Sequence, residues 1–279
     1  MLMMGLSQSL RYQKPLNWSR TALRCVWKAA SDSTSNSTDS NSKEVVRSIP
    51  VELRAKGIKE LDLNCDLLPP ECVIGVEWNI ENNAFKFCIT LKDKPLTRRG
   101  ILSTVSSIYD LLGFTAPFLL RGKRILQLPC RESVGWDDAI PDRLQMQWEM
   151  WRNQLSLLEM MEVPRCFKLK EMENLKKVQL HHFSDASTEG YGQCSYLRLV
   201  DTGNCSLVMG KARVTPLKPI TVPRLELTAA VVSVRVSEML SRELGYNEVE
   251  EVFWTHSKVV QAYIHNDARQ FHTFVANRV

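Results

Sequence analysis

The stretch His181-His182-Phe183-Ser184-Asp185-Ala186-Ser187 ends a predicted strand with a single acid, which is followed by small residues. About forty residues later, Arg224-Leu225-Glu226-Leu227-Thr228-Ala229-Ala230 carries a second acid near the start of a long helical pattern. Pro223 favours a helix start here, so we expect Glu226 in the first helical turn, near the sheet end where Asp185 emerges. A third segment, Phe253-Trp254-Thr255-His256-Ser257, ends another apolar run with a histidine and a serine.

The elements around these segments follow a definite order. Apolar patterns predict strands at 178–186, 191–200 and 206–214, a helix at 223–244, a strand at 249–255 and then further helices. Three antiparallel strands, followed by a helix that crosses over to a parallel strand, make up the ribonuclease H order. We therefore expect the fold class α/β (α+β), with a ribonuclease H-like mixed sheet in the C-terminal half. The helix face packed on this sheet is predicted to comprise Val222, Leu225, Ala229, Val232, Val236 and Leu240.

A β-hairpin is expected upstream of this sheet. Two short apolar runs, Val73–Trp78 and Ala84–Ile89, are separated by Asn82-Asn83, a pair typical of turns.

A small helical unit is expected between the hairpin and the sheet. Thr97 can cap a first helix that ends at Gly113, and Pro117 and Pro141 can open a second and a third helix. Tryptophans recur on one face of the third helix, so we interpret them as core residues rather than a base-stacking platform. The apolar positions of the three helices include Ile101, Val105, Ile108, Leu120, Leu128, Leu144, Trp148, Trp151 and Leu155.

The N-terminal residues differ in composition from the rest. Residues 31–42 contain only serine, aspartate, threonine and asparagine, so they cannot bury apolar surface. The first thirty residues hold five basic residues and no acidic one. We expect residues 1–42 to be an atypical leader followed by a disordered linker.

Positive charge is concentrated in one part of the chain. Residues 92–131 hold eight basic residues against two acidic ones, a net charge of +6, whereas the whole chain carries +5. This pattern is consistent both with a phosphate-binding face and with a solvated helix face. The candidate nucleic-acid-binding residues are Lys92, Lys94, Arg98, Arg99, Arg121, Lys123 and Arg124.

The cysteines and the apolar runs exclude other classes of protein. The eight cysteines include no Cys-x-x-Cys pair and no histidine partner at zinc-finger spacing, so we expect no structural zinc. No apolar run approaches the roughly 18 to 20 residues that span a bilayer. We expect a soluble intracellular protein, cytoplasmic or nuclear, with free thiols, no membrane partner and no small-molecule substrate.

The amino-acid sequence resembles that of the BEL/Pao retrotransposon Pol polyproteins, in the region named the Pao retrotransposon peptidase family. The resemblance begins near residue 41 and includes many motifs in one order. Besides the three segments above, they are Thr97 to Ser103, Leu112-Gly113-Phe114 with Ala116-Pro117-Phe118, Gly135-Trp136-Asp137, and Arg269 to Val279.

The resemblance implies a division of the chain. Residues 43–176 would be the end of a reverse transcriptase palm with a helical thumb-like or connection-like region, and residues 177–279 a truncated ribonuclease H-like domain. In the family a reverse transcriptase core precedes this region and an Asn-Pro-Ala-Asp segment with a fourth acid follows it. Neither motif occurs here, so we expect a Pol fragment.

The resemblance also assigns the site residues. Asp185 matches the first catalytic acid and Glu226 the second, while His256 stands where the family has the third. Ribonuclease H cleavage uses two magnesium ions, and Mg²⁺ prefers oxygen ligands. Asp185 and Glu226 are the ancestral metal ligands, and we expect Mg²⁺ to be weakly bound or lost. Neighbouring His181 and His182 point to opposite faces of a strand and cannot both bind one ion.

Three functions follow as alternatives. The first is a remnant of a Pol polyprotein with an inactive ribonuclease H-like domain, and the second is a non-catalytic module that binds an RNA/DNA hybrid weakly and without sequence preference. The third is an active enzyme, either a nuclease or an aspartic peptidase, as the family name implies. Asp201-Thr202-Gly203 has the form of a retropepsin loop. Because it lies between two predicted strands, we interpret it as a hairpin turn.

Overall fold

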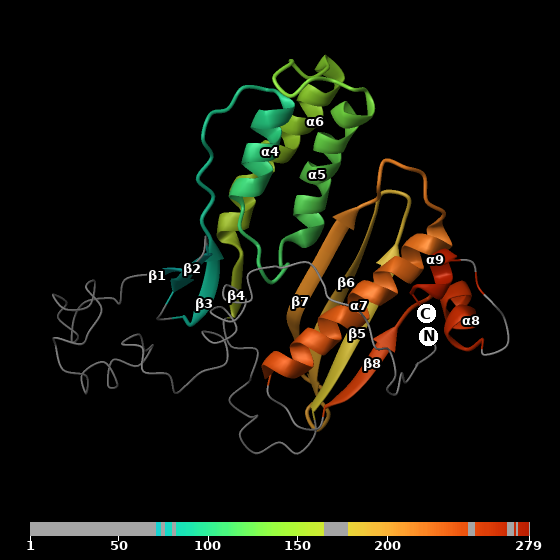
Figure 1. Cartoon of the computed structure of the whole chain (residues 1–279). Coiled ribbons are helices and arrows are strands. Elements are labelled where there is room, and N and C mark those ends of the chain that lie inside the picture. Colours follow the sequence, from blue (N-terminus) through green and yellow to red (C-terminus); the bar gives the residue numbers. More distant parts are fainter. Residues whose placement is uncertain are drawn as a thin grey trace, which may run out of the picture.

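The computed structural model describes residues 71–73, 76–79, 82–164, 178–244, 249–266, 271 and 273–278 of the 279-residue chain. The expected leader and linker, residues 1–42, lie outside these ranges, as do parts of the expected units 43–176 and 177–279. The division at residue 176 stays a prediction. The described elements form one antiparallel sheet, one mixed sheet and two groups of helices (Figure 1).

The first sheet is small and entirely antiparallel. Its strands, in the order β1-β2-β3-β4, are Glu71–Val73, Val76–Asn79, Ala84–Phe87 and Glu162–Pro164. The predicted hairpin is confirmed between β2 and β3, and Asn83 adopts a positive φ of 49° in the turn. The prediction of a single strand at 73–78 was wrong, because β1 ends at Val73 and pairs antiparallel with β2, with Val73 opposite Val76.

Strand β4 was not predicted. It has only three residues, and it pairs with β3 through Phe85 and Val163, almost eighty residues apart in sequence. Such a short segment carries too little periodicity to be recognised locally.

Three helices and a 3₁₀ helix connect β3 to β4. They are α4 (Arg98–Ser107), α5 (Ala116–Arg131), α6 (Asp142–Asn153) and η2 (Gln154–Met160). Thr97 caps α4 as predicted, because its hydroxyl accepts a hydrogen bond from Gly100 N at 3.2 Å. The predicted end of this helix at Gly113 was wrong. Ile108 already has extended backbone angles, and the following corner is closed by the Asp110 carboxylate, which accepts hydrogen bonds from the amide and the hydroxyl of Thr115 at 2.8 Å.

The tryptophans of α6 form the centre of this helical unit, as predicted. Trp148 and Trp151 are 5% and 1% exposed, and their rings lie 5.1 Å apart. The indole N–H of Trp151 donates to the carbonyl of Phe118 at 3.0 Å, which satisfies its one polar group. Ile101 of α4 and Ile125 of α5 belong to the same core.

The second sheet has the order β7-β6-β5-β8. Its strands are β5 (Val178–Ala186), β6 (Gly190–Leu199), β7 (Cys205–Val214) and β8 (Glu250–Trp254). The pairs β5–β6 and β6–β7 are antiparallel, while β8 runs parallel to β5. This mixed sheet confirms the predicted fold class.

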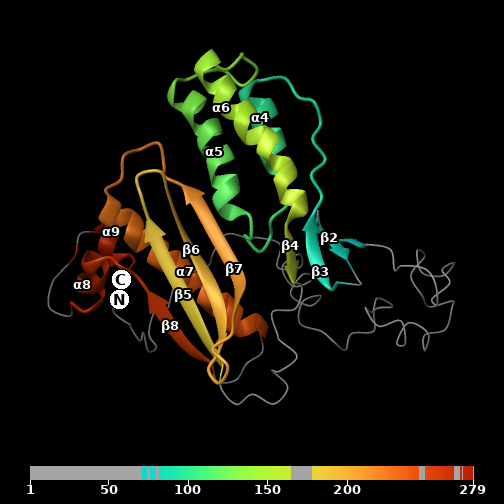
Figure 2. The same cartoon turned by 180° about the vertical axis from the view of Figure 1, so that it is seen from behind.

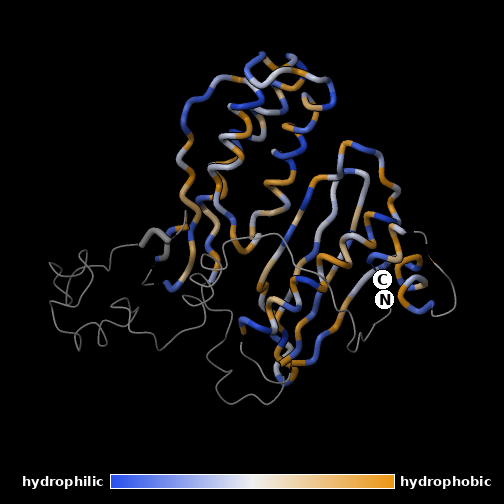
Figure 3. The backbone as a smooth tube through the Cα atoms, viewed as in Figure 1, coloured by the Kyte–Doolittle hydropathy of each residue, from blue (hydrophilic) through white to orange (hydrophobic). Residues whose placement is uncertain are grey.

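One long helix covers one face of this sheet. Helix α7 (Val222–Leu244) lies across the strands in Figure 1, and the view from behind in Figure 2 presents the opposite face. Leu240 of α7 is fully buried against Leu180 of β5, and Leu225, Ala229 and Val236 are also buried, as predicted. Figure 3 shows hydrophobic residues on both the helix and the strands. Helices α8 (Lys258–Ile264) and α9 (Thr273–Ala276) contribute Val260 and Val275 to a smaller core around Leu227.

The helical unit contacts the second sheet along β7 (Figure 1). The amide of Gly210 donates to the carbonyl of Leu112 at 2.7 Å, and the Gln127 side chain donates to the carbonyl of Thr215 at 2.5 Å. In the described parts of the chain, no helix is both long enough and apolar enough to cross a membrane.

Candidate active site

Asp185 lies near the C-terminal end of β5, on the sheet face opposite α7. Its side chain is 73% exposed, and its Oδ1 atom accepts a hydrogen bond from the amide of Ala186 at 2.6 Å. Register places it beside Gly192 of β6, so no neighbouring side chain on that strand covers the carboxylate. The prediction that this acid emerges at the end of the sheet is confirmed by its position in β5.

Glu226 is contributed by α7 and is much less exposed. Its side chain is only 12% exposed, and Oε2 accepts a hydrogen bond from the hydroxyl of Ser257 at 2.5 Å. The predicted position in the first helical turn was wrong by a small margin. The helix begins at Val222, one residue before Pro223, which makes Glu226 the fifth helical residue.

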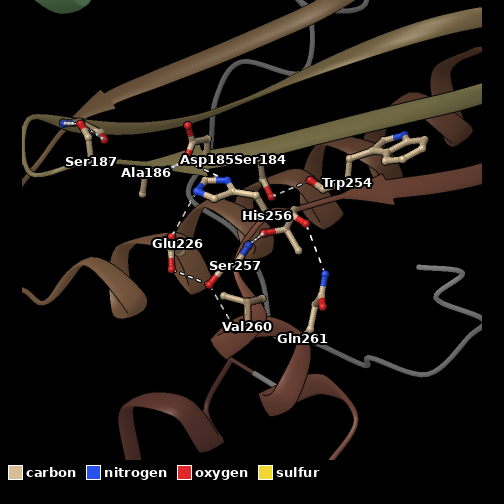
Figure 4. Close-up of polar contacts among 12 residues, drawn as sticks. Ser184, Asp185, Ala186, Ser187, Glu226, Trp254, His256, Ser257, Val260 and Gln261 are labelled. Carbon is tan, nitrogen blue, oxygen red and sulfur yellow. Dashed lines mark hydrogen bonds and ion pairs between the residues drawn. The ribbon is translucent and has the colours of Figure 1, made fainter. Parts of the chain in front are cut away.

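His256 lies between the two carboxylates (Figure 4). Its Nδ1 atom is 3.6 Å from Oδ1 of Asp185, and its Nε2 atom is 3.8 Å from Oε1 of Glu226. When protonated, the imidazole pairs with both acids and offsets one of their two negative charges. The three residues that the sequence singled out are therefore brought together, with the ring as a spacer between the acids.

Ser257 holds the segment after β8 in place, and the sequence analysis gave it no role. Its hydroxyl donates to Glu226 and also accepts from the amide of Val260 at 3.3 Å, which caps α8. Its own amide donates to the hydroxyl of Thr255 at 3.2 Å. A serine directly before an apolar helical pattern is a recognisable cap, so local sequence could have revealed the helix start but not the bond to Glu226.

The donor set does not fit a pair of magnesium ions. Two-metal cleavage needs several carboxylates that converge on ions about 3.5 to 4 Å apart. Here the two carboxylates lie 3.6 and 3.8 Å from the two nitrogens of one imidazole, and imidazole nitrogen suits zinc or copper better than magnesium. Among the described residues, no group of three or more histidines, cysteines, aspartates and glutamates is arranged to hold a metal ion.

Comparison with known proteins places the chain in a family. Over residues 97–257, more than half of its length, the sequence matches the family described as Pao retrotransposon-like RNaseH-like domain. The chain belongs to this family. No curated protein matches it. A solved structure of the foamy viral protease-reverse transcriptase in complex with RNA/DNA hybrid is similar, with 12% sequence identity and a TM-score of 0.43. The similarity covers 74% of this chain and 27% of that one.

The side chains of the two histidines of β5, His181 and His182, lie on opposite faces of the sheet. His181 Nδ1 accepts a hydrogen bond from the indole N–H of Trp254 at 2.9 Å, so this nitrogen carries no proton. Burial, with a smaller contribution from Arg198, lowers the pKa of His181 and favours this neutral form. His182 lies on the α7 side, where its Nδ1 is 2.8 Å from the hydroxyl of Ser195. As predicted, the pair cannot bind one ion.

His182 is fully buried and neutral. The Ser195 hydroxyl donates to Gln193 at 2.9 Å, so its oxygen must accept from His182 Nδ1, which carries the proton. Burial lowers the pKa of His182 to about 4, and Glu251 opposes this shift only in part.

The predicted nucleic-acid-binding residues differ in how freely their side chains could contact a phosphate. Arg98 donates to the carbonyl of Val134 at 2.5 Å and lies over the ring of Trp136, so it is held inside the helical unit. Arg99 is exposed but paired with Asp137, and Arg124 is paired with Glu189. The other four, Lys92, Lys94, Arg121 and Lys123, are exposed. Nucleic-acid binding by these side chains stays a prediction.

The Asp201-Thr202-Gly203 triplet forms the turn between β6 and β7. The amide of Gly203 donates to the carbonyl of Leu199 at 2.9 Å, and Gly203 has a φ of 72°. Asp201 is exposed at the tip of this turn. The predicted hairpin is therefore confirmed, and the triplet is part of the ribonuclease H-like sheet.

Proposed function

We propose that this chain is a ribonuclease H-like module of a retrotransposon Pol protein that binds nucleic acid without cleaving it. The observation that carries the proposal is the imidazole of His256 between Asp185 and Glu226. In this position the ring separates the acids that would have to share metal ions. A neutral imidazole adds no negative charge, and a protonated one competes with Mg²⁺ for the same carboxylates.

The chain's own residues support binding rather than chemistry. Asp185 is largely exposed and could still accept hydrogen bonds, but Glu226 is already held by Ser257 and screened by His256. In the part of the chain that is described, no group of three or more histidines, cysteines, aspartates and glutamates could hold a metal ion. Exposed basic residues of the helical unit would supply contacts to phosphates.

An aspartic peptidase is the weaker alternative. Retropepsin catalysis requires two aspartates that share a proton, one from each half of the barrel. Asp201 lies in an exposed hairpin turn of a mixed sheet that is covered by a helix on one face, which is not the environment of a retropepsin loop.

The binding proposal is tested by fluorescence anisotropy with a labelled RNA/DNA hybrid over a range of salt concentrations. Wild-type protein should bind weakly, with affinity that falls steeply as salt rises. Lys123→Ala should weaken binding and reduce the slope of log K against log salt by about one. Lys218→Ala is the matched control, because Lys218 is an exposed lysine outside the basic stretch. Equal behaviour of the two variants would contradict a phosphate-binding face at residues 92–131.

A further inference from the structure

Three aromatic side chains gather on the face of the second sheet that α7 leaves open. Phe183 of β5 has Cys194 of β6 and Trp254 of β8 as its register partners, and Tyr196 pairs with His181. Because alternate residues of a strand point to opposite faces, Phe183, Tyr196 and Trp254 share the face of Asp185. All three rings are half-buried, so part of each is accessible.

The rings are held in fixed orientations. Phe183 and Trp254 are parallel within 5°, with centroids 5.7 Å apart, and Tyr196 meets Phe183 edge-on at 5.9 Å. His181 also stacks on Trp254, with centroids 5.9 Å apart. The hydrogen bond from the Trp254 indole to His181 prevents the larger ring from turning. We call the rings of Phe183, Tyr196 and Trp254 the aromatic platform. Rings held in defined planes are what a planar ligand requires.

A cavity of about 710 Å³ lies over this platform. The strands supply one side, and Phe114 and Pro117, from the corner before α5 and its first turn, supply the other. The cavity extends along the sheet to Asp185 and His256, so it is continuous with the candidate active site. Its size is within the range of small-molecule and nucleotide pockets.

The charge around the cavity favours an anionic ligand. Among the described residues that line it, Asp185 is the only acid, whereas Lys211 and Lys258 are basic. Lys258 is exposed at the first position of α8, and α5 carries Arg121 and Lys123 beyond the cavity wall. An apolar floor between basic margins suits an aromatic base whose phosphates lie at the rim.

We propose that this cavity binds an unpaired base of a single-stranded nucleic acid, stacked on the Phe183–Trp254 pair. The assignment rests on the proposed nucleic-acid-binding function and specifies its ligand and its site. Stacking requires only the π-face of the base, so the site discriminates little between sequences.

The test uses the full chain and a single-stranded oligothymidylate with one 2-aminopurine, whose emission falls when it stacks. Wild-type protein should quench the emission and bind the oligonucleotide. Trp254→Leu should abolish the quenching and weaken binding about five- to hundredfold, the range that base stacking on one aromatic residue contributes. Trp136→Leu is the matched control, because Trp136 is 47% exposed on the helical unit and outside the cavity.

A second variant tests the cavity without removing the Trp254 ring, whose loss could itself disturb the packing of the sheet. Leu207→Glu leaves the platform intact and places a carboxylate on the half-buried cavity wall, so it should also weaken the single strand's binding. Leu207→Gln, of nearly the same shape, should weaken binding much less. Circular dichroism and thermal unfolding of each variant establish that the fold is retained.

The outcomes separate this inference from the proposed function. If wild-type protein binds neither the hybrid nor the single strand, both fail. If it binds the hybrid with the expected salt dependence but leaves 2-aminopurine emission unchanged, only the cavity assignment is overturned. Equal losses in Trp254→Leu and Trp136→Leu would overturn it as well.

Discussion

Gly113 and Gly210 pack backbone against backbone where the helical unit meets β7. A Cβ atom added to Gly210 would lie 2.7 Å from the carbonyl oxygen of Gly113, and one added to Gly113 would overlap the carbonyl of Gly210. The neighbouring hydrogen bond from Gly210 N to Leu112 O requires this close approach. Gly113 also has a φ of 77°, a conformation that side chains disfavour. The junction between the two parts of the molecule thus depends on two glycines.

Gly113→Ala should therefore destabilise the protein by roughly 2 to 4 kcal/mol, because backbone strain and steric overlap add together. Gly203→Ala provides the matched control. Gly203 has nearly the same φ of 72°, but no atom lies within 4 Å of its added Cβ, so its cost should be only about 1 kcal/mol. Chemical denaturation of both variants measures the difference. Similar losses would mean that the Gly113–Gly210 contact is not formed.

Burial of His182 should make stability depend on pH. Its folded-state pKa of about 4 lies below the ordinary value of 6.5, so the unfolded chain takes up a proton first as the pH falls. The stabilisation is complete above pH 6.5 and is lost between pH 6.5 and 4, with a total of roughly 3 kcal/mol. His182→Asn keeps a donor near Ser195 but does not titrate. Urea denaturation across this range should show a flatter pH dependence for the variant, and identical slopes would refute the assignment.

Asp201→Asn should leave the protein unchanged. Asparagine is as suitable as aspartate in a turn, and no residue depends on the exposed carboxylate for a described hydrogen bond. Wild-type and variant proteins should yield no specific fragments when incubated near pH 5, with or without pepstatin. A pepstatin-sensitive fragment from the wild type alone would establish the peptidase alternative and the shared-proton chemistry that it requires.

His256→Asp should destabilise the metal-free protein at low salt, because a third carboxylate would face Asp185 and Glu226. Mg²⁺ should restore the melting temperature of this variant while recovering little cleavage, since a two-metal site needs further ligands. His256→Asn, which adds no charge, is the control. A variant that melts like the wild type without metal would indicate that the three side chains do not converge.

The repeating patterns of the sequence were enough to predict the fold class and the positions of most elements. The alternation along 178–214 and the apolar face of α7, from Leu225 to Leu240, correspond directly to burial in the structure. The predictions of the elements use local periodicity, which a sequence carries explicitly. The assignment of Asp185, Glu226 and His256 to one site came from the resemblance to the BEL/Pao Pol polyproteins.

Features that depend on long-range geometry were not predicted. The short strand β4 is a strand only because β3 lies beside it. The end of α4 is set by Asp110 and Thr115, whose bonds close the corner that brings Gly113 to Gly210. The role of Ser257 depends on α7 presenting Glu226 to it, and the engagement of Arg98 depends on Val134 and Trp136.

The proposal that the Asp185, Glu226 and His256 cluster does not cleave RNA is tested most directly with an RNA/DNA hybrid labelled on its RNA strand. The hybrid is incubated with excess protein in Mg²⁺ and separated on a denaturing gel, with Asp185→Asn protein as the control. We predict that the RNA stays intact with both proteins over many hours. RNA cleavage by the wild type that disappears in Asp185→Asn would contradict the account.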